Sequence, residues 1–477
     1  MTEGGDGIVS VTGGAGGIEA RYDDIETLAQ MFDGTGDDLR SYAWDDKGIA
    51  VNGDLVESSI LSPGTFASAE SAVLAATIGP NGLAFEAVDL EVDALAMRAN
   101  VVILRGADDL QRQAIEALDY LAGRTLGTVL PALLLIGGTG ALLTLASNPA
   151  LAGLLYLHRD ELAQMTQEEL VSFLEEHPEV VQHLINGGGG LVDGLASNLP
   201  PGVREALLAH LGLDPVHLTT NDIAGDLGGL FEDTGVHVTE GGETPRDLTA
   251  PGSIEELIDN LNVTNRGANG EIDIIRIGEG DDARYIVNLP GTDTFPPGGP
   301  DVRDGLANLQ LIGGEETAYA RGIREAMEQA GIPPGAPVAL VGHSQGGMTA
   351  VHLANDSSFT DRFNVQHVVT AGAPTAQVPD LPDSVQTLSL ENTGDLVPLT
   401  DGEDNPDQPN RTTVRFDNPT GSIGGNHGLD VYAAGGRLVD ESDHPSLVET
   451  RDRLQQDGFM GSDDPVSTST YTITRDR

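Results

Sequence analysis

The sequence contains no cysteine. This absence excludes disulfides, thiolate nucleophiles and metal sites built from cysteine. It leaves the cellular compartment open, because secreted proteins also can lack disulfides.

Basic residues are scarce as well. Lys47 is the sole lysine, and 24 basic against 75 acidic residues give a formal net charge of −51. Nucleic-acid binding needs clustered Lys and Arg to contact phosphates, so this composition argues against it. An anionic bilayer would also repel the chain unless salt or divalent cations screen the charge. We interpret the charge as serving solubility or growth in high salt, with no partner implied.

The first residues lack the features of a signal peptide. Residues 1–17 are Gly-rich and acidic, without a basic stretch or a long apolar run. We therefore expect either a cytoplasmic protein or one exported by a non-classical route of the type VII kind. A chain of 477 residues has room for about two or three domains.

The N-terminal part, residues 1–125, has helical periodicity. Apolar positions recur at helical spacing in residues 22–42, 66–78 and 84–122, and the segment 41–46 breaks the pattern. Trp44 lies in that break, as in the helical hairpins of WXG-type proteins and related type VII secretion substrates, which this region resembles. Asp46 stands where those proteins have glycine. An ordinary amphipathic helical domain is the alternative interpretation.

Residues 125–157 contain no charged side chain. The stretch 128–147 is long enough to span a bilayer. Pro131 and Asn148-Pro149 fit a hairpin of two apolar helices equally well, and basic or aromatic flanks typical of membrane spans are missing. We expect a buried hairpin, followed by connecting helices up to residue 261. Membrane contact through 128–157 is the alternative.

The pattern changes after residue 261. Predicted strands alternate with helices, which indicates an α/β domain with a mainly parallel sheet flanked by helices. We place this domain at residues 262–460 and expect 461–477 to form a tail or an edge strand. The predicted strands cover 271–277, 283–289, 338–341, 365–370, 385–390 and 412–416, with a helix at 318–330.

The sequence Gly342-His343-Ser344-Gln345-Gly346 separates the buried strand 338–341 from a helical stretch. Strand, tight turn and helix is the context in which G-x-S-x-G forms a nucleophile elbow. Gly342 and Gly346 would remove side chains that collide with the strand or the helix. The alternative is a Gly-rich structural turn that happens to contain a serine.

A serine hydroxyl needs a base to take its proton, and the base needs a carboxylate to orient it. Asp395 follows the strand 385–390, and His427 follows the strand 412–416, so both come in the expected order after Ser344. Glu391 is the alternative acid and His444 the alternative base.

Two backbone N–H groups are candidates for an oxyanion hole. One belongs to Gln345, directly after the predicted nucleophile. The other belongs to Thr292, in a loop after the strand 283–289 where Gly291 leaves room for a substrate. A plain turn after the strand is the alternative for this second group. No metal site is expected, because the acidic loop 400–410 lacks the ligand spacing of an EF-hand.

Four motifs together resemble the class 3 lipase group of α/β-hydrolases, which also resembles many actinobacterial proteins with helical N-terminal regions. They are Leu289-Pro290-Gly291-Thr292, Gly342 to Gly347, Thr370-Ala371-Gly372-Ala373-Pro374, and Gly394-Asp395-Leu396-Val397-Pro398 ahead of His427. Pro290 departs from the pattern, since arginine is common there. The resemblance implies a serine esterase or lipase of lipid metabolism that forms an acyl-enzyme on small-molecule or lipid esters, without cofactor.

Two alternatives from other functional classes stay open. One is a secreted effector whose helical half inserts into membranes. The other is a non-catalytic binding protein with an α/β-hydrolase fold.

Overall fold

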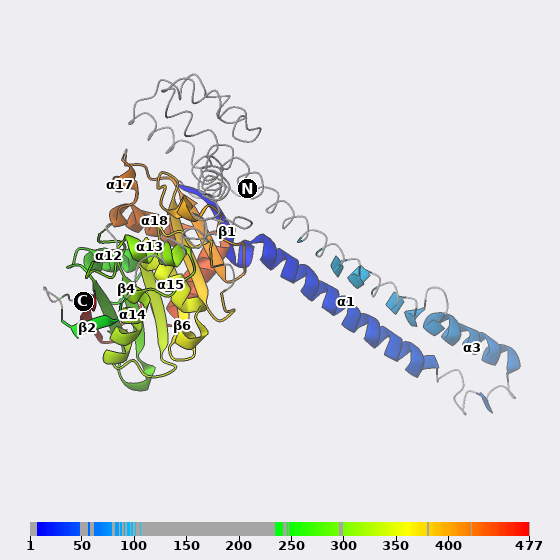
Figure 1. Cartoon of the computed structure of the whole chain (residues 1–477). Helices are drawn as coiled ribbons and strands as arrows, with labels where there is room; N and C mark the ends of the chain where they lie inside the picture. The colour runs from blue at the N-terminus through cyan, green and yellow to red at the C-terminus, as the bar shows by residue number, and fades with distance from the viewer. Residues whose placement is uncertain are drawn as a thin grey trace, which may run out of the picture. The chain divides into compact units, whose positions relative to one another are not determined.

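The computed structural model describes residues 7–47, 62–78, 234–241, 246, 248–294, 299–378, 381–420 and 422–476, with short pieces between 56 and 105. The chain divides into two compact units (Figure 1). Residues Ile18–Ala114 form one unit, and Met1–Gly17 with Ile115–Arg477 form the other.

The smaller unit is helical, as predicted for this region. Helix α1 (Ile18–Lys47) packs along α3 (Pro63–Ile78), and its buried side chains include Tyr22 and Ala29. An ion pair of 2.6 Å joins Arg98 to Asp33 of α1. The predicted break at 41–46 is wrong, because α1 continues to Lys47. That segment contains neither proline nor glycine, so nothing in it opposes a helix.

In the larger unit, nine strands of the described chain form one mixed sheet in the order β1-β8-β7-β6-β5-β4-β3-β9-β2. Strands β4 to β8 are parallel to one another, and the other pairings are antiparallel. The predicted class, an α/β fold with helices flanking the sheet, therefore describes this unit. The strands are β1 (Ile8–Gly13), β2 (Val236–Glu240), β3 (Glu271–Ile277), β4 (Arg284–Leu289), β5 (Pro337–His343), β6 (Asn364–Ala371), β7 (Gln386–Asn392), β8 (Arg411–Phe416) and β9 (Val466–Arg475).

The predicted boundaries of this unit, 262–460, are too narrow. Strand β1 comes from the first residues of the chain, which were assigned to the helical region, and it pairs with β8 at one edge of the sheet. Strand β9 is neither a tail nor an edge strand, since it lies between β3 and β2. These pairings join segments far apart in sequence, which local periodicity does not reveal.

Helices cover both faces of the sheet. Strand β5 shows the arrangement, because Val338 and Leu340 face one apolar core while Ala339 and Val341 face the other. Helices α14 and α15 contribute to the first core, and α12, α18 and α19 to the second. Among the described residues, the helices of this unit are α12 (Ile254–Asn265), α13 (Gly305–Ile312), α14 (Ala318–Gln329), α15 (Gln345–Asn355), α16 (Ser357–Thr360), α17 (Ile423–Asn426), α18 (Leu429–Glu441) and α19 (Pro445–Gln456), with 3-10 turns η1 (Gly14–Gly16), η3 (Gly280–Asp282) and η4 (Pro398–Asp401).

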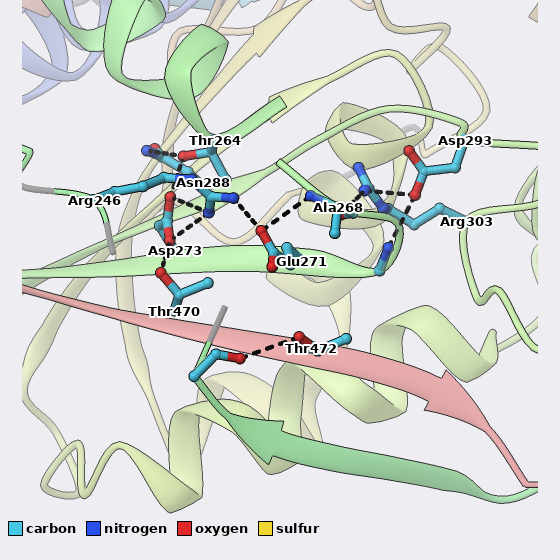
Figure 2. Close-up of polar contacts among 12 residues, drawn as sticks. Arg246, Thr264, Ala268, Glu271, Asp273, Asn288, Asp293, Arg303, Thr470 and Thr472 are labelled. Atoms are coloured by element: carbon cyan, nitrogen blue, oxygen red, sulfur yellow. Dashed lines mark hydrogen bonds and ion pairs between the residues drawn. The ribbon is translucent and has the colours of Figure 1, made fainter. Parts of the chain in front are cut away.

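A buried polar cluster joins β3 to its neighbours (Figure 2). The carboxylate of Asp273 is fully buried and accepts hydrogen bonds from Arg246 at 2.9 Å, Thr264 at 2.8 Å and Thr470 at 2.5 Å. Because each partner comes from a different segment, the cluster ties α12 and β9 to β3. Losing one partner would leave a buried charge poorly compensated.

Within the described residues, no helix has the length and apolar character needed to cross a membrane. The segment 128–157, with most of the predicted region 126–261, lies outside those residues.

Candidate active site

Ser344 occupies the turn between β5 and α15. Its backbone angles are φ 52° and ψ −123°, and it is the one non-glycine residue with positive φ in the described part of the chain. Such a conformation costs about 1–3 kcal/mol and persists only where its surroundings enforce it. Here the Ser344 N–H donates to the Ala371 carbonyl of β6 at 2.9 Å, which fixes the turn against the sheet.

The glycines beside Ser344 are required by close packing. A Cβ atom on Gly342 would overlap the carbonyl oxygen of Gly346. A Cβ atom on Gly346 would overlap the carbonyl oxygen of Leu289, where β4 ends. The start of α15 thus lies directly against the ends of β4 and β5, as a nucleophile elbow requires.

Asp395 and His427 form a hydrogen-bonded pair. The His427 Nδ1–H donates to Asp395 Oδ2 at 2.6 Å. The Asp395 carboxylate is fully buried, and its Oδ1 accepts from the Val397 N–H at 3.0 Å, while the His427 side chain is 20% exposed. With its proton held at Nδ1, the neutral imidazole carries a lone pair on Nε2 and can act as a base there.

This pair lies next to the elbow. His343 precedes Ser344, and its Nε2–H donates to the backbone carbonyl of His427 at 2.9 Å. The two imidazole rings are 4.5 Å apart between centroids. Burial, followed by the neighbouring His427, lowers the pKa of His343 to about 3, so His343 stays neutral. The structure therefore brings the predicted serine, acid and base to one edge of the sheet.

The alternative acid and base lie elsewhere. Glu391 pairs with Arg415 Nε at 2.9 Å and accepts from Asn405 at 2.7 Å. Burial raises the pKa of Glu391, and Arg415 opposes that shift. His444 precedes α19 and packs beside Gly16, next to β1. In the described residues neither side chain hydrogen bonds to Asp395 or His427.

The two candidate oxyanion donors are linked by a side chain that the sequence did not identify. Asn308 of α13 accepts from Gln345 Nε2 at 2.9 Å and donates to Thr292 Oγ1 at 3.1 Å. The backbone N–H groups of Gln345 and Thr292 find no acceptor within the described chain. Both groups are thus free to bind an oxygen atom of a substrate.

Arg303 supports the loop that carries Thr292. Its Nη1 donates to the Gly291 carbonyl at 3.1 Å, and its guanidinium pairs with Asp293 at 2.5 Å (Figure 2). Arg303 is almost fully buried. Burial raises the pKa of Asp293, and the nearby guanidinium opposes this effect. The loop is therefore preorganised rather than held by surface contacts.

No group of three or more histidine and acidic side chains placed to hold a metal ion occurs in the described part of the chain. This part includes the loop 400–410. Its Asp401 instead accepts from the Ala376 N–H at 2.7 Å, and burial raises the pKa of Asp401 to about 8.

Comparisons with protein families, curated proteins and solved structures give no match to this chain.

Proposed function

We propose that this protein is a serine hydrolase of the α/β-hydrolase fold that cleaves carboxylic esters. The observation that carries the proposal is the strained backbone of Ser344 at the end of the central strand β5. Strain of this kind is retained where function needs it. The hydrogen-bonded pair of His427 and Asp395 beside it supplies the base that a serine nucleophile requires.

The reaction would proceed through an acyl-enzyme. Ser344 Oγ attacks the ester carbonyl carbon while His427 Nε2 takes the hydroxyl proton, and Asp395 stabilises the imidazolium. The negative charge on the carbonyl oxygen is bound by the N–H groups of Gln345 and Thr292, and loss of one such donor costs about 3 kcal/mol. When the tetrahedral intermediate collapses, the C–O bond to the alcohol breaks and His427 gives its proton to the leaving oxygen.

Deacylation repeats these steps with water. His427 takes a proton from the water molecule, whose oxygen attacks the acyl carbon, and then returns a proton to Ser344 Oγ as the acid leaves. No cofactor or metal is needed to balance the reaction.

The topology supports this proposal. Ser344, Asp395 and His427 follow β5, β7 and β8 in that order, and these strands are parallel. Ligand sites of open α/β sheets lie at the carboxyl ends of the strands. A chain of charge −51 favours neutral acyl esters over strongly anionic substrates at low salt.

Hydrolysis of p-nitrophenyl acetate and of longer p-nitrophenyl esters tests the proposal. We expect Ser344→Ala to lose at least about 10³-fold in kcat, because removal of the nucleophile abolishes acyl-enzyme formation. Ser389→Ala is a matched control, since Ser389 is a fully buried serine on β7 whose hydroxyl has no partner in the described residues. Unchanged turnover in Ser344→Ala would refute the proposal.

A further inference from the structure

Tyr432 of α18 contacts the carboxylate of the candidate triad. Its side chain is fully buried, and its hydroxyl donates to Asp395 Oδ2 at 2.6 Å. The same oxygen accepts from His427 Nδ1 at 2.6 Å. Two hydrogen bonds of equal length therefore end at one carboxylate oxygen.

The surroundings of Tyr432 fix this contact. Its ring lies edge-on to Phe416 at 5.6 Å between centroids. Gly372 has φ +61°, and a Cβ atom there would lie 2.8 Å from the Tyr432 hydroxyl, so glycine makes room for the phenol. The Asn392 N–H donates to the hydroxyl oxygen at 3.4 Å, which leaves the phenolic proton for Asp395.

The protonation state of the Tyr432 phenol also favours its hydrogen bond to Asp395. Burial and the neighbouring Asp395 raise the pKa of Tyr432 well above its ordinary range, so the phenol keeps its proton near neutral pH and can donate it. A surface hydroxyl would exchange its partner with bulk water, whereas the Tyr432 side chain is fully buried.

We propose that Tyr432 is a positioning residue that holds the Asp395 carboxylate in place and weakens its attraction for the proton on His427 Nδ1. A carboxylate that already accepts a strong hydrogen bond is a poorer acceptor for a second donor at the same oxygen. Tyr432 would thus keep His427 from binding its proton too tightly for a general base that works near neutral pH.

Other titratable or charged groups face this site from several elements. His343 lies on β5 and is neutral, Glu391 lies on β7 and pairs with Arg415, and Arg303 supports the loop after β4. None of these groups hydrogen bonds to Asp395 in the described chain. Tyr432 is therefore the side chain whose removal should change the carboxylate selectively.

The test compares Tyr432→Phe with Tyr471→Phe. The second variant removes the hydroxyl of a buried tyrosine on β9, three strands away from β5. The first readout is the downfield proton resonance of His427 Nδ1–H, assigned by its loss in His427→Asn. We expect Tyr432→Phe to move it further downfield, because Asp395 becomes a stronger acceptor, and Tyr471→Phe to leave it in place. An unmoved or upfield-shifted resonance in folded Tyr432→Phe would overturn the inference.

The second readout is the pH profile of kcat/KM on p-nitrophenyl acetate, and its interpretation rests on the proposed function. We expect the acid limb of Tyr432→Phe to move to higher pH by about half a unit to one unit, with kcat/KM about threefold to tenfold lower on that limb. An unmoved acid limb would contradict the role. If wild-type hydrolysis does not depend on Ser344, the proposed function fails, while the proton resonance still decides whether Tyr432 tunes Asp395.

Should Tyr432→Phe not fold, the wild type offers another measurement. The Tyr432 hydroxyl proton should resonate downfield and exchange slowly, and Asp395→Asn should move it upfield. If the chemical shift of this hydroxyl proton did not change in Asp395→Asn, the inference would be overturned.

Discussion

Asp395 accepts three hydrogen bonds within the protein. The donors are His427 Nδ1–H and the Tyr432 hydroxyl, both at 2.6 Å, and the Val397 N–H at 3.0 Å. Because the carboxylate is fully buried, it cannot rotate without leaving one of these donors unpaired. Its orientation, and with it the orientation of His427, is set before any substrate binds.

On the proposed function, Asp395→Asn should therefore abolish most ester hydrolysis without unfolding the protein. An amide nitrogen facing His427 would favour the tautomer with its proton on Nε2, which cannot take a proton from Ser344. We expect kcat for p-nitrophenyl acetate to fall by about 10³- to 10⁴-fold, with an unchanged circular dichroism spectrum.

Glu391→Gln is the matched control for that variant. Glu391 is a buried carboxylate on the same stretch of chain, but it pairs with Arg415. We expect its replacement to lower stability and to preserve kcat per folded molecule. Loss of activity in Glu391→Gln together with an active Asp395→Asn would show that the acid has been misassigned.

At the scale of elements, the turn between β5 and α15 was predictable from local sequence. An apolar run ends at Gly342, and helical spacing begins after Ser344. The contact that requires Gly342 is with Gly346 of the same turn, whereas the contact that requires Gly346 is with Leu289 of β4, which is distant in sequence. The motif indicates both glycines, but only the fold explains the second. Asp395 and His427 were proposed as acid and base from their positions after predicted strands, and the structure pairs them through a hydrogen bond of 2.6 Å.

Contacts between distant segments were not predictable. Asn308 and Tyr432 lie on helices α13 and α18, and only the fold brings them to the loop of Thr292 and to Asp395. Strand β1 is rich in β-branched residues from Ile8 to Thr12, and its partner β8 lies near the other end of the chain. Sequence patterns indicate strands, but they do not say which strands pair.

Gly346→Ala tests the packing of this turn. The added Cβ atom would overlap the Leu289 carbonyl oxygen, and backbone cannot move aside as a flexible side chain can. We expect a loss of at least about 3 kcal/mol in the free energy of unfolding, as for other overpacked sites in rigid cores.

Gly34→Ala in α1 is the control for the same substitution. No atom outside its own turn lies within 4 Å of a Cβ at Gly34, so alanine should raise helix stability by about 1 kcal/mol. Thermal unfolding followed by circular dichroism measures both variants. Equal melting temperatures for Gly346→Ala and the wild type would contradict the close approach of α15 to β4.

At the scale of the whole molecule, several of the few basic residues lie in the interior of the protein. Arg303 and Arg411 are among the largest fully buried side chains, and Arg475 pairs with the buried Asp304 at 2.7 Å. Arg303 and Arg475 pair with Asp293 and Asp304. Arg411 donates to the carbonyls of Thr375 and Val378. The proposed preference for a neutral ester follows from the net charge of −51, which repels anionic molecules at low salt.

Ser344 is the proposed nucleophile. Covalent trapping by a neutral p-nitrophenyl phosphonate ester is the direct test of this role. The serine oxygen attacks phosphorus and p-nitrophenolate leaves, which gives a stable adduct. We predict one adduct per chain in the intact mass, located on Ser344 by peptide mapping, and one equivalent of p-nitrophenolate released. Absence of the adduct, its location on another residue, or equal release by Ser344→Ala would contradict the proposed function.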